Sequence, residues 1–179
     1  MVKRILISML ILVFAGGMAY AATADIPKTG QTESQATGDD GDLEKGVAWP
    51  SPRFVVSGDC VTDNLTGLVW TKSPDSASVT WTGALSYANN LTLCDKDDWR
   101  LPNLNEIESL VNAGQSDSAT WLNNQGFVSV DFFNYWTSTT YAASTDSAWY
   151  VGMQDGWLDV WDKNDPDFTA FAWAVRAGQ

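Results

Sequence analysis

The chain has 179 residues and an acidic composition, with 22 aspartates and glutamates against 10 lysines and arginines and a formal net charge of −12. Such a surface repels phosphate backbones and sulfated polymers, which excludes nucleic acid as a partner. The chain contains no histidine, so the commonest metal ligand and general base of proteins is absent from it.

The first 21 residues have the features of a signal peptide. Lys3 and Arg4 precede an apolar run, residues 5–14, and Ala19-Tyr20-Ala21 places small residues where signal peptidase needs them. The alternative is an uncleaved membrane anchor, because residues 5–24 carry no charge and are just long enough to span. We favour cleavage, which predicts a secreted protein, extracellular, at the cell surface or in the periplasm, without a membrane span after signal removal.

Residues 22–48 are polar and weakly hydrophobic, which predicts a flexible lead-in. All ten tryptophans lie between Trp49 and Trp173, so the packed domain is predicted at residues 49–179. A domain of this length buries about two-thirds of its unfolded surface around one core.

The first half of this domain alternates between strand and helix signals. Residues 54–56 and 61–71 have strand-like composition, and Gly67 supplies the positive φ of a hairpin loop within the second segment. Thr80 is expected to cap a helix that runs to about Asn90, with apolar residues along one face.

A second helix is predicted after the segment Asp98-Trp99-Arg100-Leu101-Pro102-Asn103. The leucine before the proline is held extended. Asn103 and Glu106 have the spacing of a capping box, in which each side chain bonds a free backbone N–H of the first turn. A tryptophan and an arginine therefore pass through a fixed corner into a short helix.

The last third of the chain changes to a period of two. Four strands are predicted at residues 135–141, 148–153, 157–161 and 171–176, after a polar connection at residues 113–126. Asp155-Gly156 is a strong hairpin signal between the middle pair. Two early helices followed by a late antiparallel sheet predict an α+β fold.

Cys60 and Cys94 are the two cysteines of the chain. In an exported protein, a small even number of cysteines predicts a structural disulfide, here between the first hairpin and the loop before Trp99. The alternative is a pair of free or metal-binding thiols, which an oxidising compartment disfavours.

Six motifs carry a resemblance to a known family: GVAWPSPRF (46–54), DNLTGLVW (63–70), YANNL (87–91), DWRLPN (98–103), YWTST (135–139) and AWYV (148–151). Together they resemble the Lcl C-terminal domain family, which has no known function and occurs in a bacterial collagen-like adhesin and its relatives. This resemblance implies a C-type-lectin-like domain that binds an extracellular ligand, with sugars or sulfated glycans as candidates. Sulfated glycans do not carry over to this chain, because they need a basic face.

The resemblance also bears on several single residues. It implies that Val175-Arg176 closes the chain as a strand of the late sheet, and that the lead-in is more ordered than its composition predicts, since residues 27–31 resemble the family's own lead-in. It assigns Trp99 to packing under the helix and Arg100 to an ion pair with a carboxylate such as Asp97 or Asp98. The residues given structural roles are Trp99, Arg100, Pro102, Asn103 and Arg176.

Alternation in the last predicted strand places Trp173 and Val175 on one face and Ala172, Ala174 and Arg176 on the other. Arg176 is expected to form a structural ion pair.

The Arg-Leu-Pro corner and the terminal valine-arginine pair are also similar to the formylglycine-generating enzyme branch of the superfold. That branch uses a reactive cysteine pair in its late strands, whereas no cysteine follows Cys94 here. A carboxylate pair among Asp155, Asp159 and Asp162 would suit glycosidase chemistry, but the spacing singles none out. We therefore predict no catalytic residues and no enzymatic activity.

The candidate binding residues lie in the late strands. Alternation places Trp157, Asp159 and Trp161 on one strand face and Leu158 and Val160 on the other. If Leu158 and Val160 point to the core, the other face, which we call the aromatic row, points to solvent. Tryptophans beside hydrogen-bonding groups suit the binding of sugar rings. The alternative is that these tryptophans pack under a loop or a neighbouring subunit. The predicted ligand-binding residues are Trp149, Asp155, Trp157, Asp159 and Trp161.

The loop that follows supplies oxygen ligands of the kind that calcium prefers, namely Asp162, Asn164, Asp165 and Asp167. The spacing does not match an EF-hand loop, because Pro166 stands where a ligand is expected. Calcium is one interpretation of this loop and a solvated acidic loop is the other. No other cofactor is predicted.

The sequence thus favours an exported, non-enzymatic module that binds an extracellular glycan or a surface protein through its late hairpin. The alternative is a structural subunit that forms a homo-oligomeric surface layer or fibre. In that case the tryptophan-rich strands are an interface between copies.

Overall fold

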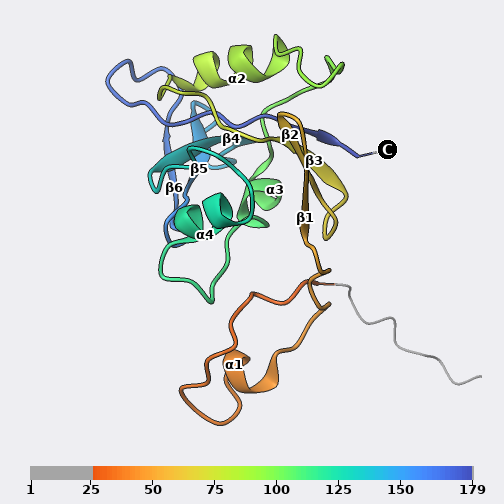
Figure 1. Ribbon diagram of the computed structural model, residues 1–179. Coiled ribbons are helices and arrows are strands. Elements are labelled where there is room, and N and C mark those ends of the chain that lie inside the picture. Colours follow the sequence, from red (N-terminus) through yellow and green to blue (C-terminus); the bar gives the residue numbers. More distant parts are fainter. Residues whose placement is uncertain (1–25, 179) are drawn as a thin grey trace, which may run out of the picture.

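The computed structural model describes residues 26–178 (Figure 1). The signal peptide predicted at residues 1–21 lies outside the described residues, as do residues 22–25 of the lead-in. Within the described part, no helix is long and apolar enough to cross a membrane.

Two antiparallel sheets form the framework of the domain. The first has the order β1-β2-β3-β7 and the second the order β4-β5-β6. The first sheet consists of β1 (Phe54–Ser57), β2 (Cys60–Asp63), β3 (Leu68–Thr71) and β7 (Val175–Ala177). The second consists of β4 (Asn134–Thr140), β5 (Ser147–Gly152) and β6 (Leu158–Asp162). The predicted mixture of helices and antiparallel strands is confirmed.

Two of the four helices within residues 26–178 are those that the sequence predicts. These are α2 (Trp81–Asn89), capped by Thr80, and α3 (Leu104–Glu108), whose capping box of Asn103 and Glu106 is present as predicted. The other two are α1 (Asp40–Leu43) in the lead-in and α4 (Ser118–Asn124). The polar connection predicted at residues 113–126 therefore contains a helix, which begins where Asp117 accepts hydrogen bonds from the N–H groups of Ala119 and Thr120.

Two buried clusters lie on the two faces of the second sheet. The first cluster joins α3 and α4 to the face that carries Tyr135 and Val151. The second joins α2 to the face that carries Trp136 and Tyr150. Alternation along each strand thus sends successive side chains into different cores.

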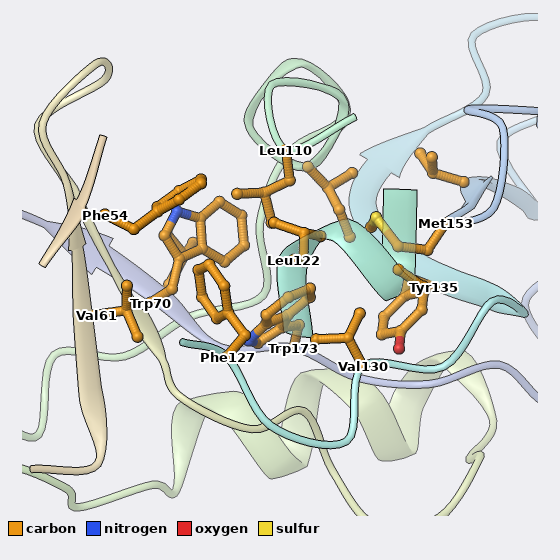
Figure 2. Close-up of a cluster of buried hydrophobic side chains, with 14 residues drawn as sticks. Phe54, Val61, Trp70, Leu110, Leu122, Phe127, Val130, Tyr135, Met153 and Trp173 are labelled. Carbon is orange, nitrogen blue, oxygen red and sulfur yellow. The ribbon is translucent and has the colours of Figure 1, made fainter. Parts of the chain in front are cut away.

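The first cluster is built around interlocking aromatic rings (Figure 2). Trp173 meets Trp70 edge-on at 5.5 Å and Phe127 at 5.2 Å between ring centroids, and Phe127 meets Phe54 at 5.1 Å. The indole N–H of Trp173 donates to the backbone oxygen of Thr71 at 2.8 Å. These edge-to-face contacts fix the first sheet against the last segment of the chain.

The strand predicted at residues 171–176 is shorter than expected, and it belongs to a different sheet. Only Val175–Ala177 forms a strand, and it pairs with β3 of the first sheet rather than with the late sheet that the resemblance implied. The predicted alternation still holds, because Trp173 and Val175 lie in the first cluster while Ala172 and Ala174 lie in the second. This extended segment therefore separates the two cores.

The lead-in forms a closed loop that contacts the domain (Figure 1). The N–H of Lys28 donates to the oxygen of Val47 at 3.0 Å, and the N–H of Ala113 donates to the oxygen of Thr29 at 3.0 Å. A Cβ on Gly30 would lie 2.2 Å from the Asn112 side chain, so only glycine allows this approach. Composition predicted a flexible segment because it does not reveal these backbone contacts.

Candidate ligand-binding site on the late hairpin

The predicted aromatic row is exposed along β6 and the residue before it. Trp157 is 63% exposed and Trp161 41% exposed, and Asp159 between them is exposed as well. Leu158 and Val160 are half-buried, and Leu158 packs on the first cluster. The row therefore faces solvent, as the alternation predicted.

Trp161 is held in one orientation. Its ring stacks on Phe168 with the centroids 4.6 Å apart and the planes 17° apart, which covers one face of the indole. Its N–H donates to the carboxylate of Asp165 at 2.8 Å, and this bond lowers the pKa of Asp165. An indole fixed on one face and 41% exposed presents its other face to solvent without further ordering.

The acidic residues of the row bond to nearby groups of the hairpin. Asp155 accepts a hydrogen bond from the N–H of Trp157 at 3.0 Å, which fixes the turn before β6. Asp159 accepts from the N–H of Val160 at 2.8 Å and lies 3.5 Å from the hydroxyl of Tyr150. Burial, and then the nearby Asp159 charge, raise the pKa of Tyr150, so this hydroxyl stays a neutral donor at neutral pH.

The structure does not bring Trp149 into the row. Trp149 pairs with Val160 across β5 and β6, whereas Tyr150 pairs with Asp159 and Ala148 with Trp161. Paired residues point to the same face of a sheet, so Trp149 lies on the face opposite to Trp161. There it contacts Tyr141 edge-on at 5.4 Å.

The acidic loop after β6 holds itself together with its own carboxylates. Asp162 accepts from the N–H of Asn164 at 2.8 Å, and Asp165 accepts from the N–H of Asp167 at 2.9 Å. Within residues 26–178, no three acidic, histidine or cysteine side chains converge in a way that would hold a metal ion. Calcium binding by this loop stays a prediction that the geometry does not support.

The corner before α3 is stabilised by two ion pairs. Trp99 is buried in the second cluster. Arg100 pairs with Glu106 through contacts of 2.5 and 2.6 Å rather than with Asp97 or Asp98, because the capping box brings Glu106 back over the corner. Asp98 instead pairs with Arg176 at 2.6 and 3.1 Å, which confirms the predicted ion pair of Arg176.

The predicted disulfide joins Cys60 of β2 to Cys94, with their Cα atoms 6.6 Å apart. Cys94 and Asp95 occupy the two central positions of a tight turn closed by Leu93 and Lys96, and both have positive φ. The bond thus ties the first sheet to the loop that enters the Trp99 corner.

A hollow of about 530 Å³ lies between the lead-in, α3 and the turn of the late hairpin. Its lining includes Lys28, Trp49, Leu65, Glu108, Val111 and Asp155. Burial raises the pKa of Glu108. Sequence reasoning missed this hollow because one of its walls exists only when the lead-in contacts Ala113.

The sequence model of the Lcl C-terminal domain matches residues 59–176, which is more than half of the chain. The chain belongs to the Lcl C-terminal domain family. No curated protein matches it at a significant level.

The matched range places the candidate site within the Lcl C-terminal domain itself. Residues 155–167, with the aromatic row and the acidic loop, lie inside the match, as do Cys60 and Cys94. The lead-in and β1 lie before it. The row is therefore part of the Lcl C-terminal domain, while the hollow of about 530 Å³ also needs residues from outside the match.

Proposed function

We propose that this Lcl C-terminal domain is an exported binding module, without catalytic activity, that recognises an extracellular carbohydrate through Trp157, Asp159 and Trp161. The observation that carries the proposal is the pair of open indoles on one strand face, with the exposed Asp159 between them and the Asp165 carboxylate bonded to the Trp161 indole. Sugar rings have apolar C–H faces that stack on aromatic rings, and hydroxyls that bond to carboxylates.

The spacing of the two tryptophans favours an oligosaccharide over a single sugar. They lie four positions apart in extended chain, so their Cα atoms are about 13 Å apart. One sugar ring does not reach both indoles, whereas consecutive units of a chain do. Trp161 is already fixed by Phe168 and Asp165, so binding would immobilise few side chains.

Binding rather than catalysis is favoured by what the hairpin carboxylates already do. Asp155, Asp162 and Asp165 each accept a backbone N–H two residues ahead, and so shape the turn and the loop. A general acid or nucleophile needs a carboxylate free to meet the reacting atom. These side chains are better placed to position the indoles than to react.

Export and the finer fold assignment belong to the same proposal. The disulfide is typical of oxidising compartments and so supports secretion to the cell surface, the medium or the periplasm. Membership of the family supports the C-type-lectin-like fold that the motifs implied. A surface glycoprotein would present the same sugars and is a partner of the same class.

Replacing Trp157 with alanine is expected to weaken glycan binding by about 1–3 kcal/mol, because it removes one stacking surface without opening a core. The Trp161→Ala variant should lose a similar amount. Binding is measured on an array of neutral and anionic oligosaccharides, and the melting temperature of each variant reports its fold. Val55→Ala, at a similarly exposed position of the first sheet, is the matched control and should bind as the parent does.

Unchanged binding by both tryptophan variants, in proteins that still melt cooperatively, would contradict the proposed site. Loss of cooperative melting in Trp157→Ala would also contradict it, since the residue would then serve the fold.

A self-assembling structural subunit is the second candidate function. β6 is an edge strand of the second sheet, and its exposed face carries Trp161, with Trp157 directly before the strand. Such an edge can pair with a strand of another copy. Light scattering on the purified mature protein separates the two functions, because assembly predicts large oligomers that grow with concentration and shrink in Trp157→Ala.

A further inference from the structure

A pocket of about 310 Å³ opens at the start of β4. It is lined by Ser78, Phe133, Asn134, Thr169, Ala170 and Phe171. No ionisable side chain belongs to this lining, although the whole chain carries a net charge of −12. The pocket is therefore suited to an uncharged group, since a charged one would lose its hydration without gaining an ion-pair partner.

The pocket adjoins the tryptophan row across a glycine. Asn134 pairs with Gly152, whose N–H donates to the backbone oxygen of Trp157 at 2.7 Å. A Cβ on Gly152 would lie 3.7 Å from the amide oxygen of Asn134 and 3.5 Å from the Cβ of Trp157. The Asn134 amide and the Trp157 side chain thus flank the same position on the same face of the second sheet.

The Asn134 side-chain amide is the lining group whose hydrogen-bond donors and acceptor are all free to bind a ligand. It is half-buried, and within residues 26–178 it makes no side-chain hydrogen bond. The hydroxyls of Ser78 and Thr169 bond to each other at 2.9 Å. An asparagine amide offers two donors and one acceptor in a plane, which matches another amide.

The remaining walls of the pocket are apolar. Phe133 is 55% exposed and is supported by Phe132, with the ring centroids 4.2 Å apart. Ala170 is buried and Phe171 half-buried. The lining thus combines the Asn134 amide with two phenylalanines and an alanine, which suits a ligand group that has an N–H, a carbonyl and a methyl together.

We propose that this pocket binds the acetamido group of an N-acetylated amino sugar, while the same glycan stacks on Trp157. Asn134 donates to the acetamido carbonyl and accepts from its N–H, and the acetamido methyl packs on the exposed ring of Phe133. This inference rests on the proposed carbohydrate function and names the sugar class that the site selects.

Three tetrasaccharides with the same β-1,4-linked backbone isolate the acetamido group: the N-acetylglucosamine tetramer, the glucosamine tetramer and the glucose tetramer. Calorimetric titration of the mature protein should show the N-acetylated tetramer binding about tenfold or more tightly than the glucose tetramer, as two added hydrogen bonds and a buried methyl imply. The Asn134→Leu variant should bind both tetramers equally. Trp157→Ala should weaken both by a similar factor.

The matched control is Asn124→Leu, which makes the same replacement at the exposed last residue of α4 and should change neither affinity. Phe133→Ala, at an exposed position, should also reduce the preference for the N-acetylated tetramer. Melting temperatures show whether each variant is folded.

Equal affinity for the N-acetylglucosamine and glucose tetramers would overturn the acetamido assignment and leave the carbohydrate function standing, provided that Trp157→Ala weakens both. Tighter binding of the glucosamine tetramer would overturn the assignment too, since it would show selection for positive charge. Absence of binding to all three would overturn it as well, and the glycan array would then decide whether the proposed function also fails.

Discussion

Replacing Arg53 with methionine is expected to lower the free energy of unfolding by about 3–5 kcal/mol, because it leaves a buried carboxylate without its partner. The side chains of Arg53 and Asp63 are 4% and 0% exposed, and the guanidinium donates to both oxygens of Asp63 at 3.1 Å. Arg53 also donates to the backbone oxygen of Ser109 at 2.5 Å. One arginine therefore joins β1, β2 and the end of α3.

Methionine is chosen because it keeps most of the apolar stem that packs beside Trp49, whose ring centre lies 4.4 Å from the guanidinium carbon. The matched control is Lys28→Met, which breaks the exposed pair of Lys28 and Glu44. That change should cost less than about 1 kcal/mol, because solvent screens an exposed ion pair. Urea unfolding curves give both values.

Asp63→Asn supplies a second, independent measurement. In the Arg53→Met background, Asp63→Asn should lower the free energy of unfolding by less than it does in the parent protein. In the parent, Asp63→Asn leaves a buried guanidinium unpaired, whereas in Arg53→Met that guanidinium is already gone. If Arg53→Met costs no more than Lys28→Met, the buried pair does not stabilise the fold in the way described. The same conclusion would follow if the loss of unfolding free energy in the double variant equalled the sum of the losses in Arg53→Met and Asp63→Asn.

The parts of the fold that sequence predicted well are those fixed by neighbouring residues. The corner from Asp98 to Asn103 and the capping box with Glu106 depend on contacts within a few residues, and both are present. The disulfide followed from having two cysteines in an exported chain. Local chemistry of this kind leaves the chain few alternatives, so it can be inferred without knowing the tertiary structure.

The missed features depend on residues far apart in the chain. Pairing of β7 with β3 joins residues about a hundred positions apart, and no local pattern distinguishes the first sheet from the second. The short helix α4 has weak periodicity over seven residues, although Asp117 was an available capping signal. The lead-in is ordered by backbone bonds to Val47 and Ala113, which composition does not encode.

The candidate site shows the same division. Alternation along a single strand placed Trp157 and Trp161 on one face, which was expected to face solvent if Leu158 and Val160 pointed to the core, and both tryptophans are exposed. It did not predict which β5 residues share that face, because this depends on the register of the hairpin. Gly152 bonds to Trp157, so the even-numbered residues of β5 face the odd-numbered residues of β6, and Trp149 falls on the other side. The pocket at Asn134 is lined by residues from three separate segments of the chain, so no local sequence pattern predicted it.

Removing the disulfide is the second change with a large expected effect. The Cys60→Ala, Cys94→Ala double variant should lose about 4 kcal/mol of the free energy of unfolding, because the bond closes a loop between residues 34 positions apart and restricts the unfolded chain. For a domain of this size the melting temperature should fall by about 8–16 °C. A reductant should lower the stability of the parent protein to that of the variant and leave the variant unchanged.

The turn at Cys94 allows the cross-link to be separated from backbone strain. Cys94 has φ of +53°, which alanine adopts poorly and glycine adopts freely. The Cys60→Ala, Cys94→Gly variant should therefore be more stable than the double alanine variant by up to about 1 kcal/mol, and the loss that both share measures the cross-link itself. A shared loss below about 1 kcal/mol would mean that the unfolded chain is already compact around the first hairpin and that the bond adds little constraint.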